Sequence, residues 1–262
     1  MNRNTKRNES LKRYCAILPI VIGCIGIGNL FMKITQASAY AVLDSRGVPT
    51  IAVSLMSDGH FAIGMSPSGA STGSHEAYEW RDGGESFGGK NIQKAIECFE
   101  TIIAPQLIGK SWQSVASFDQ WLIDFDGTSN FQKIGGNLAI AASISFLRLQ
   151  AAIVDQEVFE VLRAEFNYPD ASAVVAPMVN VINGGKHAAS GLAIQETMIV
   201  PMVGATTSEK VMIAAEIFGA LKKVLTKHSM STLVGDEGGF APAIQRVSEA
   251  FDLIKEACDL TP

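Results

Sequence analysis

Residues 178–187 read Met-Val-Asn-Val-Ile-Asn-Gly-Gly-Lys-His, a short apolar run that ends in a double glycine and two basic side chains. The run has the length and composition of a buried strand, and the glycines predict a turn after it. Two more segments repeat this arrangement: a strand predicted over 196–200 opens on a glutamate, and 232–234 runs into Gly-Asp-Glu-Gly-Gly. Polar side chains at strand ends are typical of active sites in α/β proteins. We therefore expect residues 171–262 to form an α/β domain with a site at its strand ends.

Several side chains in these clusters are candidates for chemistry. Asp236 and Glu237 are adjacent carboxylates flanked by glycines, which let a ligand approach closely and allow one carboxyl to act as a general acid. His187 follows the double glycine, and Gln195 and Glu196 open the next strand. A solvated turn accounts for the two acids equally well, and a lone histidine is usually structural. The occurrence of three clusters at the ends of consecutive elements favours one common site.

The N-terminal half has a different pattern. Apolar and polar residues alternate over 34–67, and the turn residues at 57–60 predict a hairpin within a three-stranded meander. The pattern changes near residue 170, which divides the chain into predicted domains 33–170 and 171–262. Apolar periodicity predicts helices over 91–107, 137–155, 208–228 and 247–259. The second of these is apolar almost all round and is therefore expected to be buried.

A loop of small polar residues follows the predicted meander. Its glycines and serines favour mobility and offer backbone N–H and hydroxyl groups to a ligand, as in a lid, but an ordinary exposed connection has the same composition. The candidate lid residues are Ser68, Gly69, Ala70, Ser71, Thr72 and Gly73.

Composition excludes two classes of protein. The chain has 262 residues, of which 47% are hydrophobic and 18% charged, so it is too apolar to be disordered. Its formal net charge of −5 argues against a nucleic-acid partner, which would require a basic surface. The four cysteines lack metal-site spacing, and we expect a reduced, cytoplasmic chain.

The first segment, 1–32, allows three interpretations. Five basic residues precede an uncharged apolar run over 15–32, which suits an uncleaved membrane anchor and membrane contact. The small residues at 37–39 fit a signal-peptide cleavage site, although a cut there would remove half of a strand predicted over 33–43. The third interpretation is a dispensable extension, with the folded protein starting at Met32.

Four separated stretches together resemble the enolases, the phosphopyruvate hydratases of glycolysis. They occur in the family's order and are residues 43–50, 67–73, 180–187 and 234–242. The resemblance covers about residues 33–262. It implies an α/β protein, with an α+β N-terminal domain over 33–170 followed by an incomplete enolase-type β/α barrel over 171–262.

The resemblance also implies a reaction and its residues. Enolases dehydrate 2-phosphoglycerate to phosphoenolpyruvate with two Mg²⁺ ions, while a lysine removes the C2 proton and a carboxylic acid assists loss of the C3 hydroxyl. By motif match, Glu237 is that acid and Glu196 assists it. His187 and Gln195 contact the substrate, and Ser71 reaches the second metal from the lid. A homodimer is a further expectation from the family.

The sequence departs from the family pattern in two ways. It has Gly84, Phe131 and Thr197 where the family usually has an acid, a lysine and a phenylalanine. The base lysine, the acids of the first metal site and the phosphate-binding residues have no counterpart, since 171–262 suffices for about three of eight β/α units. We therefore expect a truncated enolase that is inactive alone. The alternative is a non-catalytic interaction module, membrane-tethered or not.

Overall fold

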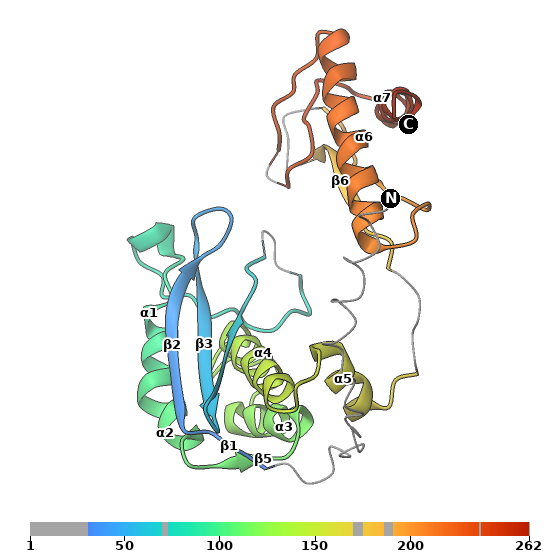
Figure 1. Cartoon of the computed structure of the whole chain (residues 1–262). Coiled ribbons are helices and arrows are strands. Elements are labelled where there is room, and N and C mark those ends of the chain that lie inside the picture. Colours follow the sequence, from blue (N-terminus) through green and yellow to red (C-terminus); the bar gives the residue numbers. More distant parts are fainter. Residues whose placement is uncertain (1–30, 70–72, 170–174, 186–190, 236, 262) are drawn as a thin grey trace, which may run out of the picture. The chain divides into compact units, whose positions relative to one another are not determined.

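A computed structural model of the chain describes residues 31–69, 73–169, 175–185, 191–235 and 237–261. The chain divides into two compact units, Met1–Asp170 and Ala171–Pro262, and each unit has its own hydrophobic core. In Figure 1 the first unit runs from blue to yellow-green along the chain, and the second continues to red.

The first unit is built on an antiparallel meander of three strands, as the alternation over 34–67 predicts. The strands are β2 (Gln36–Leu43), β3 (Pro49–Ser57) and β4 (His60–Met65). Asp58 and Gly59 join β3 to β4 with positive φ angles of 48° and 80°, the conformation that a two-residue hairpin turn requires. β2 pairs with β3 along its whole length, so a cut within residues 37–39 would divide a strand of the sheet.

The strand predicted over 33–43 is divided between two sheets. Residues Met32–Lys33 form β1, which pairs antiparallel with β5 (Ser111–Trp112) instead of extending the meander. Ile34 N donates to Lys110 O at 3.0 Å, which ties the chain to β5 before β2 begins. The prediction of one continuous strand was therefore wrong, because its first residue, Lys33, pairs with Ser111 and not with β3.

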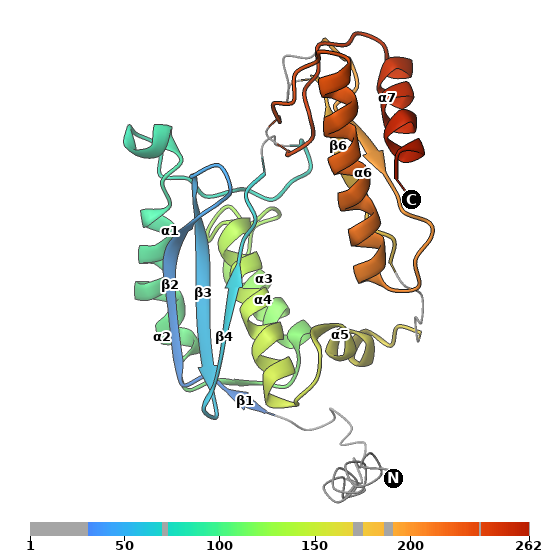
Figure 2. The same cartoon turned by 45° about the horizontal axis from the view of Figure 1, so that its top comes forward.

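Helix α4 (Gly136–Ile153) is the main support of the meander and runs along β3 and β4 (Figure 2). The close approach depends on Gly64 in β4, since a Cβ there would overlap the backbone of Ala141. Ser145 Oγ donates to Ala62 O in β4 at 3.1 Å, which adds a buried hydrogen bond between the helix and the sheet. In the part of the chain that the structure describes, α4 is long and apolar enough to cross a membrane, but most of it is buried, as in a core helix.

The other helices of the first unit complete its core. The periodic segment 91–107 is helical as predicted, but a π-helical turn lies in its middle. Two further helices, α3 (Val115–Asp126) and α5 (Val158–Phe166), were not predicted. The elements are η1 (Ser86–Gly89), α1 (Gln93–Cys98), η2 (Phe99–Ile103), α2 (Ala104–Leu107), α3 (Val115–Asp126) and α5 (Val158–Phe166). Fully buried Phe99, Phe118 and Phe146 fill the space between these helices and the sheet.

The second unit combines a small sheet with two long helices. Its elements are β6 (Val179–Asn183), β7 (Glu196–Ile199), α6 (Thr207–Lys227) and α7 (Val247–Asp259). Val181 and Ile182 of β6 are fully buried against this unit's core, in which Phe240 stacks on Phe218. The described residues of this unit form no closed barrel.

The first two strands of this unit form a hairpin, whereas a β/α unit would place a helix between parallel strands. β6 and β7 are antiparallel, and Gly185 N donates to Leu192 O at 2.8 Å beyond their ends. Antiparallel neighbours need only a short connection, while parallel ones need a crossover that is usually helical. Among the described residues, the β/α units expected over 171–262 are therefore represented by one strand followed by a helix, β7 and then α6 (Thr207–Lys227).

Candidate functional site

The end of β6 and the start of β7 lie at the same edge of the second unit's sheet. The antiparallel ladder sets Asn183, the last residue of β6, opposite Glu196, the first residue of β7. Gln195 directly precedes this pair, and its backbone C=O accepts a hydrogen bond from Gly184 N at 2.8 Å. The register therefore brings the end of one predicted strand and the polar opening of the next to one place.

The glycine-rich turn joins this edge through the backbone. Asn183 N donates to Phe240 O at 2.9 Å within a parallel bridge between β6 and Phe240. The turn before Phe240 is closed by a hydrogen bond from Gly235 N to Gly239 O at 2.8 Å. Glu237 lies in this turn and is exposed. Glu196 and Glu237 are thus both carried by segments that meet the end of β6.

The turn lies directly on two asparagine side chains. A Cβ on Gly239 would overlap Asn183 Oδ1 and would lie 2.9 Å from Asn180 Oδ1, so only glycine fits this position without a shift. Asn183 is fully buried, and its Oδ1 accepts a hydrogen bond from Asn180 Nδ2 at 3.2 Å. The asparagine pair therefore forms the support of the turn that carries Glu237.

These two asparagines were not among the predicted site residues. In a regular strand, residues three apart point to opposite faces, so the spacing of Asn180 and Asn183 gave no reason to pair them. The ladder shifts register between Asn180 and Ile182, and this irregularity brings the two amides onto one side. The only available signal was a pair of polar residues in an otherwise apolar strand.

The pair keeps unused hydrogen-bonding capacity. Asn183 Nδ2, a donor, and Asn180 Oδ1, an acceptor, are buried atoms without a hydrogen-bond partner among the described residues. Buried polar atoms in folded proteins are nearly always bonded, so an unsatisfied donor and acceptor together indicate a place where water or a ligand group fits.

Two predicted acids and one amide occupy the described part of this edge. Glu196 is half-buried, and its Oε1 accepts from Gln195 Nε2 at 3.4 Å, while Gln195 itself is exposed. His187, the predicted substrate contact, lies outside the described residues, as does Asp236. The edge therefore offers carboxylates for proton transfer and amide groups for orienting a polar ligand.

The candidate lid belongs to the first unit, and the structure describes only its flanks. Ala70, Ser71 and Thr72 lie outside the described residues. The flanks are fixed by side chains of other segments. Arg46 Nη2 donates to Ser68 O at 2.8 Å and to Gly69 O at 3.3 Å, Arg81 Nη2 donates to Ser68 Oγ at 3.0 Å, and Gly73 N donates to Glu76 Oε1 at 2.8 Å.

A metal centre would require several ligand side chains close together. The described residues contain no group of three or more histidine, cysteine, aspartate or glutamate side chains placed to hold one ion. Glu196 and Glu237 are hard oxygen donors of the kind that Mg²⁺ prefers, but two carboxylates on separate segments are not a complete set of ligands. The expected metal ligand Ser71 is outside the described residues.

Comparison with protein families matches both parts of the chain. Residues 34–162 match the family described as "Enolase, N-terminal domain", and residues 171–261 match "Enolase, C-terminal TIM barrel domain". The two matches follow each other in the chain and between them span most of it. Their positions coincide with the meander-and-helix unit and with the unit that carries the two glutamates. The chain therefore belongs to the enolase family.

Proposed function

We propose that this chain carries the acid side of an enolase-type site, for the dehydration of 2-phosphoglycerate to phosphoenolpyruvate. Enolases in general bind these two compounds as substrate and product. The observation that carries the proposal is the edge at the end of β6. There Glu196 faces Asn183 across the ladder, and the Asn183–Phe240 bond holds the turn of Glu237 at the same end of the strand.

Each predicted residue has a role in this proposal. Glu237 gives a proton to the departing C3 hydroxyl, which leaves as water, and Glu196 assists it. Gln195 and His187 bind the polar groups of the substrate. The asparagine pair under the turn orients Glu237, because general-acid catalysis requires the acid to lie within hydrogen-bond reach of the leaving oxygen.

The enolase family is generally Mg²⁺-dependent, and the metal stabilises negative charge that develops on the substrate carboxylate. Since the described residues present no three-ligand group, the fit to a resident Mg²⁺ ion is incomplete, and no catalytic step is assigned to the metal.

We further propose that the chain does not complete the reaction alone. Removal of the C2 proton needs a base, which in enolases is a lysine. The described lysines of the second unit all lie on its two helices and none lies in the segments that carry Glu196 and Glu237. They are Lys210, Lys222, Lys223, Lys227 and Lys255. An acid without its base loses most of the rate that the pair provides together.

The direct test is an assay of the purified full chain with Mg²⁺ and 2-phosphoglycerate, following phosphoenolpyruvate by its ultraviolet absorbance. We expect no turnover above the rate without protein. Turnover close to that of a complete enolase would overturn the inactive assignment. A parallel NMR titration with phosphoenolpyruvate tests binding, and E237Q and E196Q should alter the shifts of Gly184, Gly185 and Gly239 on titration.

A non-catalytic interaction module is the second candidate. It is favoured by the first unit, which has a continuous core of sheet and helices that does not draw on the strand-end residues of the second unit. Recovery of a defined partner by the full chain, with E237Q and E196Q binding it equally well, would support this alternative and count against a substrate-directed role.

For localisation we propose the cytoplasm, with anchoring through residues 15–32 as the alternative. Residues 15–30 of this segment lie outside the part of the chain that the structure describes. Fractionation of cells that express the tagged full chain separates the two. Recovery in the membrane pellet after a high-salt wash would contradict the cytoplasmic assignment, whereas release into the supernatant would contradict the anchor.

A further inference from the structure

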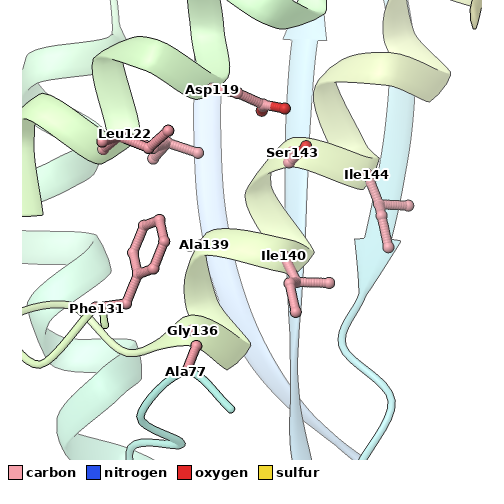
Figure 3. Close-up of a pocket in the computed structure, with 10 residues that line it drawn as sticks. Ala77, Asp119, Leu122, Phe131, Gly136, Ala139, Ile140, Ser143 and Ile144 are labelled. Atoms are coloured by element: carbon pink, nitrogen blue, oxygen red, sulfur yellow. The ribbon is translucent and has the colours of Figure 1, made fainter. Parts of the chain in front are cut away.

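The first unit contains a cavity of about 310 Å³ between α3 and α4 (Figure 3). Ala77 and Phe131 lie at one end, and Asp119 and Ser143 face each other at the opposite end. Apart from Asp119 and Ser143, the cavity is lined by alanine, leucine, isoleucine, phenylalanine and glycine. Small-molecule sites commonly have this composition, an apolar volume with a few polar groups that fix orientation.

Asp119 is the unusual residue in this lining. Its Oδ1 is buried and has no hydrogen-bond partner among the described residues. Burial raises the pKa of the Asp119 carboxyl, a hydrogen bond from Ser143 opposes the rise, and the negative charge of Glu165 adds to it. A buried carboxylate oxygen without a donor is unfavourable, and Oδ1 has no positively charged or donating partner among the described residues.

Two charged side chains of the first unit, Glu165 and Lys133, are engaged in other contacts. The carboxylate of Glu165 accepts from Val115 N at 3.1 Å and from Ala116 N at 2.6 Å, so the first turn of α3 satisfies it. Lys133 Nζ donates to Phe125 O at 2.8 Å and lies 4.4 Å from the centroid of the Phe125 ring. Neither group supplies the missing partner of Asp119.

We propose that this cavity binds a small organic ammonium ion with a flat apolar body. The ammonium group donates to Asp119 Oδ1 and to Ser143 Oγ, and the body lies along the apolar walls toward Phe131. A volume of about 150 Å³ holds a benzene molecule in a protein core, so about 310 Å³ has room for a phenyl ring with a two-carbon ammonium arm. The site is independent of the acid edge in the second unit.

Other ligand classes fit less well. An anion would meet the negative charges of Asp119 and Glu165. A neutral apolar molecule would leave Oδ1 without a donor, and a divalent cation needs about six oxygen ligands, which two oxygen-bearing side chains in an apolar cavity cannot provide. The ammonium group satisfies the acceptors, and the apolar walls bind the rest of the molecule.

The test is an NMR titration of the full chain at neutral pH with phenethylamine, compared with 2-phenylethanol and ethylamine. The first comparison removes the charge and the second removes the ring. We expect saturable shifts at the cavity residues with phenethylamine, and affinities at least about tenfold weaker for the other two probes. D119N should bind phenethylamine about tenfold or more weakly than the unaltered chain, because the substitution removes the negative charge while keeping the shape of the side chain.

D124N is the matched control, since Asp124 lies on the same helix, is exposed and does not line the cavity. It should bind phenethylamine as the unaltered chain does. A second variant, I140W, places a large ring at the cavity's exposed edge, where Ile140 is 46% exposed, and should abolish binding while Asp119 remains. This variant keeps the proposal testable if D119N folds poorly.

Three results would each overturn the proposal. One is a loss of affinity for phenethylamine in D124N as large as that in D119N, which would indicate general attraction of a cation to an acidic protein. Another is equal binding of 2-phenylethanol, which would indicate an apolar cavity without use of Asp119. The last is the absence of saturable shifts up to about 10 mM phenethylamine.

Discussion

Gly239 packs on the buried side chain of Asn183 so closely that a Cβ at position 239 would overlap Asn183 Oδ1. The same Cβ would lie 3.1 Å from Asn183 N, so a side-chain rotation alone cannot make room. The turn that carries Glu237 is therefore positioned by contact with β6 as well as by its own hydrogen bonds.

We expect G239A to destabilise the second unit by about 2 kcal/mol, because overpacking a filled site forces the backbone to shift. The free energy of unfolding in urea measures this loss, and backbone NMR shifts of Glu237 report displacement of the turn. G219A is the matched control. Gly219 lies in α6, where an added Cβ would have nothing within 4 Å, so alanine there should stabilise by about 0.5–1 kcal/mol. Equal effects of the two changes would contradict this account.

A second close approach joins β4 to α4 in the first unit. A Cβ on Gly64 would overlap Ala141 O and Ser145 N, both backbone atoms of a core helix. We expect G64A to lower the free energy of unfolding by about 3 kcal/mol or more, since neither the helix nor the strand can move without opening the core. Thermal unfolding followed by circular dichroism measures it.

The comparison for G64A is G59A, at the turn between β3 and β4. Gly59 has no atom within 4 Å of the added Cβ, but its φ is +80°, so alanine there is strained without being crowded. We expect G59A to cost about 1 kcal/mol. A larger loss in G59A than in G64A would show that helix–strand contact does not limit this site.

A third prediction concerns the link between α5 and the start of α3. Glu165 accepts from Val115 N and Ala116 N, while Ser114 Oγ caps Ser117 N at 3.1 Å. E165Q should therefore cost about 1 kcal/mol of unfolding free energy, because an ionised acceptor at a helix N-terminus is replaced by a neutral one.

The two caps of α3 satisfy different N–H groups, so we expect the losses in E165Q and S114A to add in the double variant. Urea unfolding of the two single variants and the double variant measures this. A double variant no less stable than E165Q alone would show that the caps are not independent.

The sequence was informative where one local pattern decided the outcome. Alternation predicted the meander, because Ile51, Val53 and Leu55 share the face of β3 that packs in the first unit's core. The apolar segment over 137–155, apolar almost all round, predicted α4, and most of that helix is buried. Both elements present one continuous surface to a core, and such a surface is visible in the spacing of residues.

The sequence was uninformative where the pairing of a strand depends on residues outside that strand. Met32 pairs with Trp112, and Asn183 pairs with Glu196. Each pairing depends on residues in another segment of the chain. The pairing of Asn180 with Asn183 depends on an irregularity in β6 that no alternation rule contains. Strand pairing and register are set by tertiary contacts, so the candidate acids were predicted but their support was not.

The last prediction rests on Asp126, a buried carboxylate that closes the loop between α3 and α4. It accepts hydrogen bonds from Thr128 Oγ1, Thr128 N at 3.0 Å, and Lys133 N and Ile134 N at 2.9 Å each. Burial alone would raise the pKa of the Asp126 carboxyl, but these hydrogen bonds outweigh it and lower the pKa below its ordinary value of 3.8.

Because the pKa of Asp126 is lowered by folding, the unfolded chain binds its proton first as the pH falls. The stability that Asp126 contributes is therefore fully present above the unfolded pKa of about 3.8, and it is lost as the pH falls through the lower folded pKa. We expect D126A to cost about 2–4 kcal/mol near neutral pH, since it leaves buried N–H groups such as that of Ile134 unpaired. D126N should cost less, because one carbonyl oxygen remains. D124N, on the exposed face of the same helix, should leave both the unfolding free energy and its acid dependence nearly unchanged. An acid dependence of urea unfolding that is as steep in D126N as in the unaltered chain would assign the effect to another carboxylate.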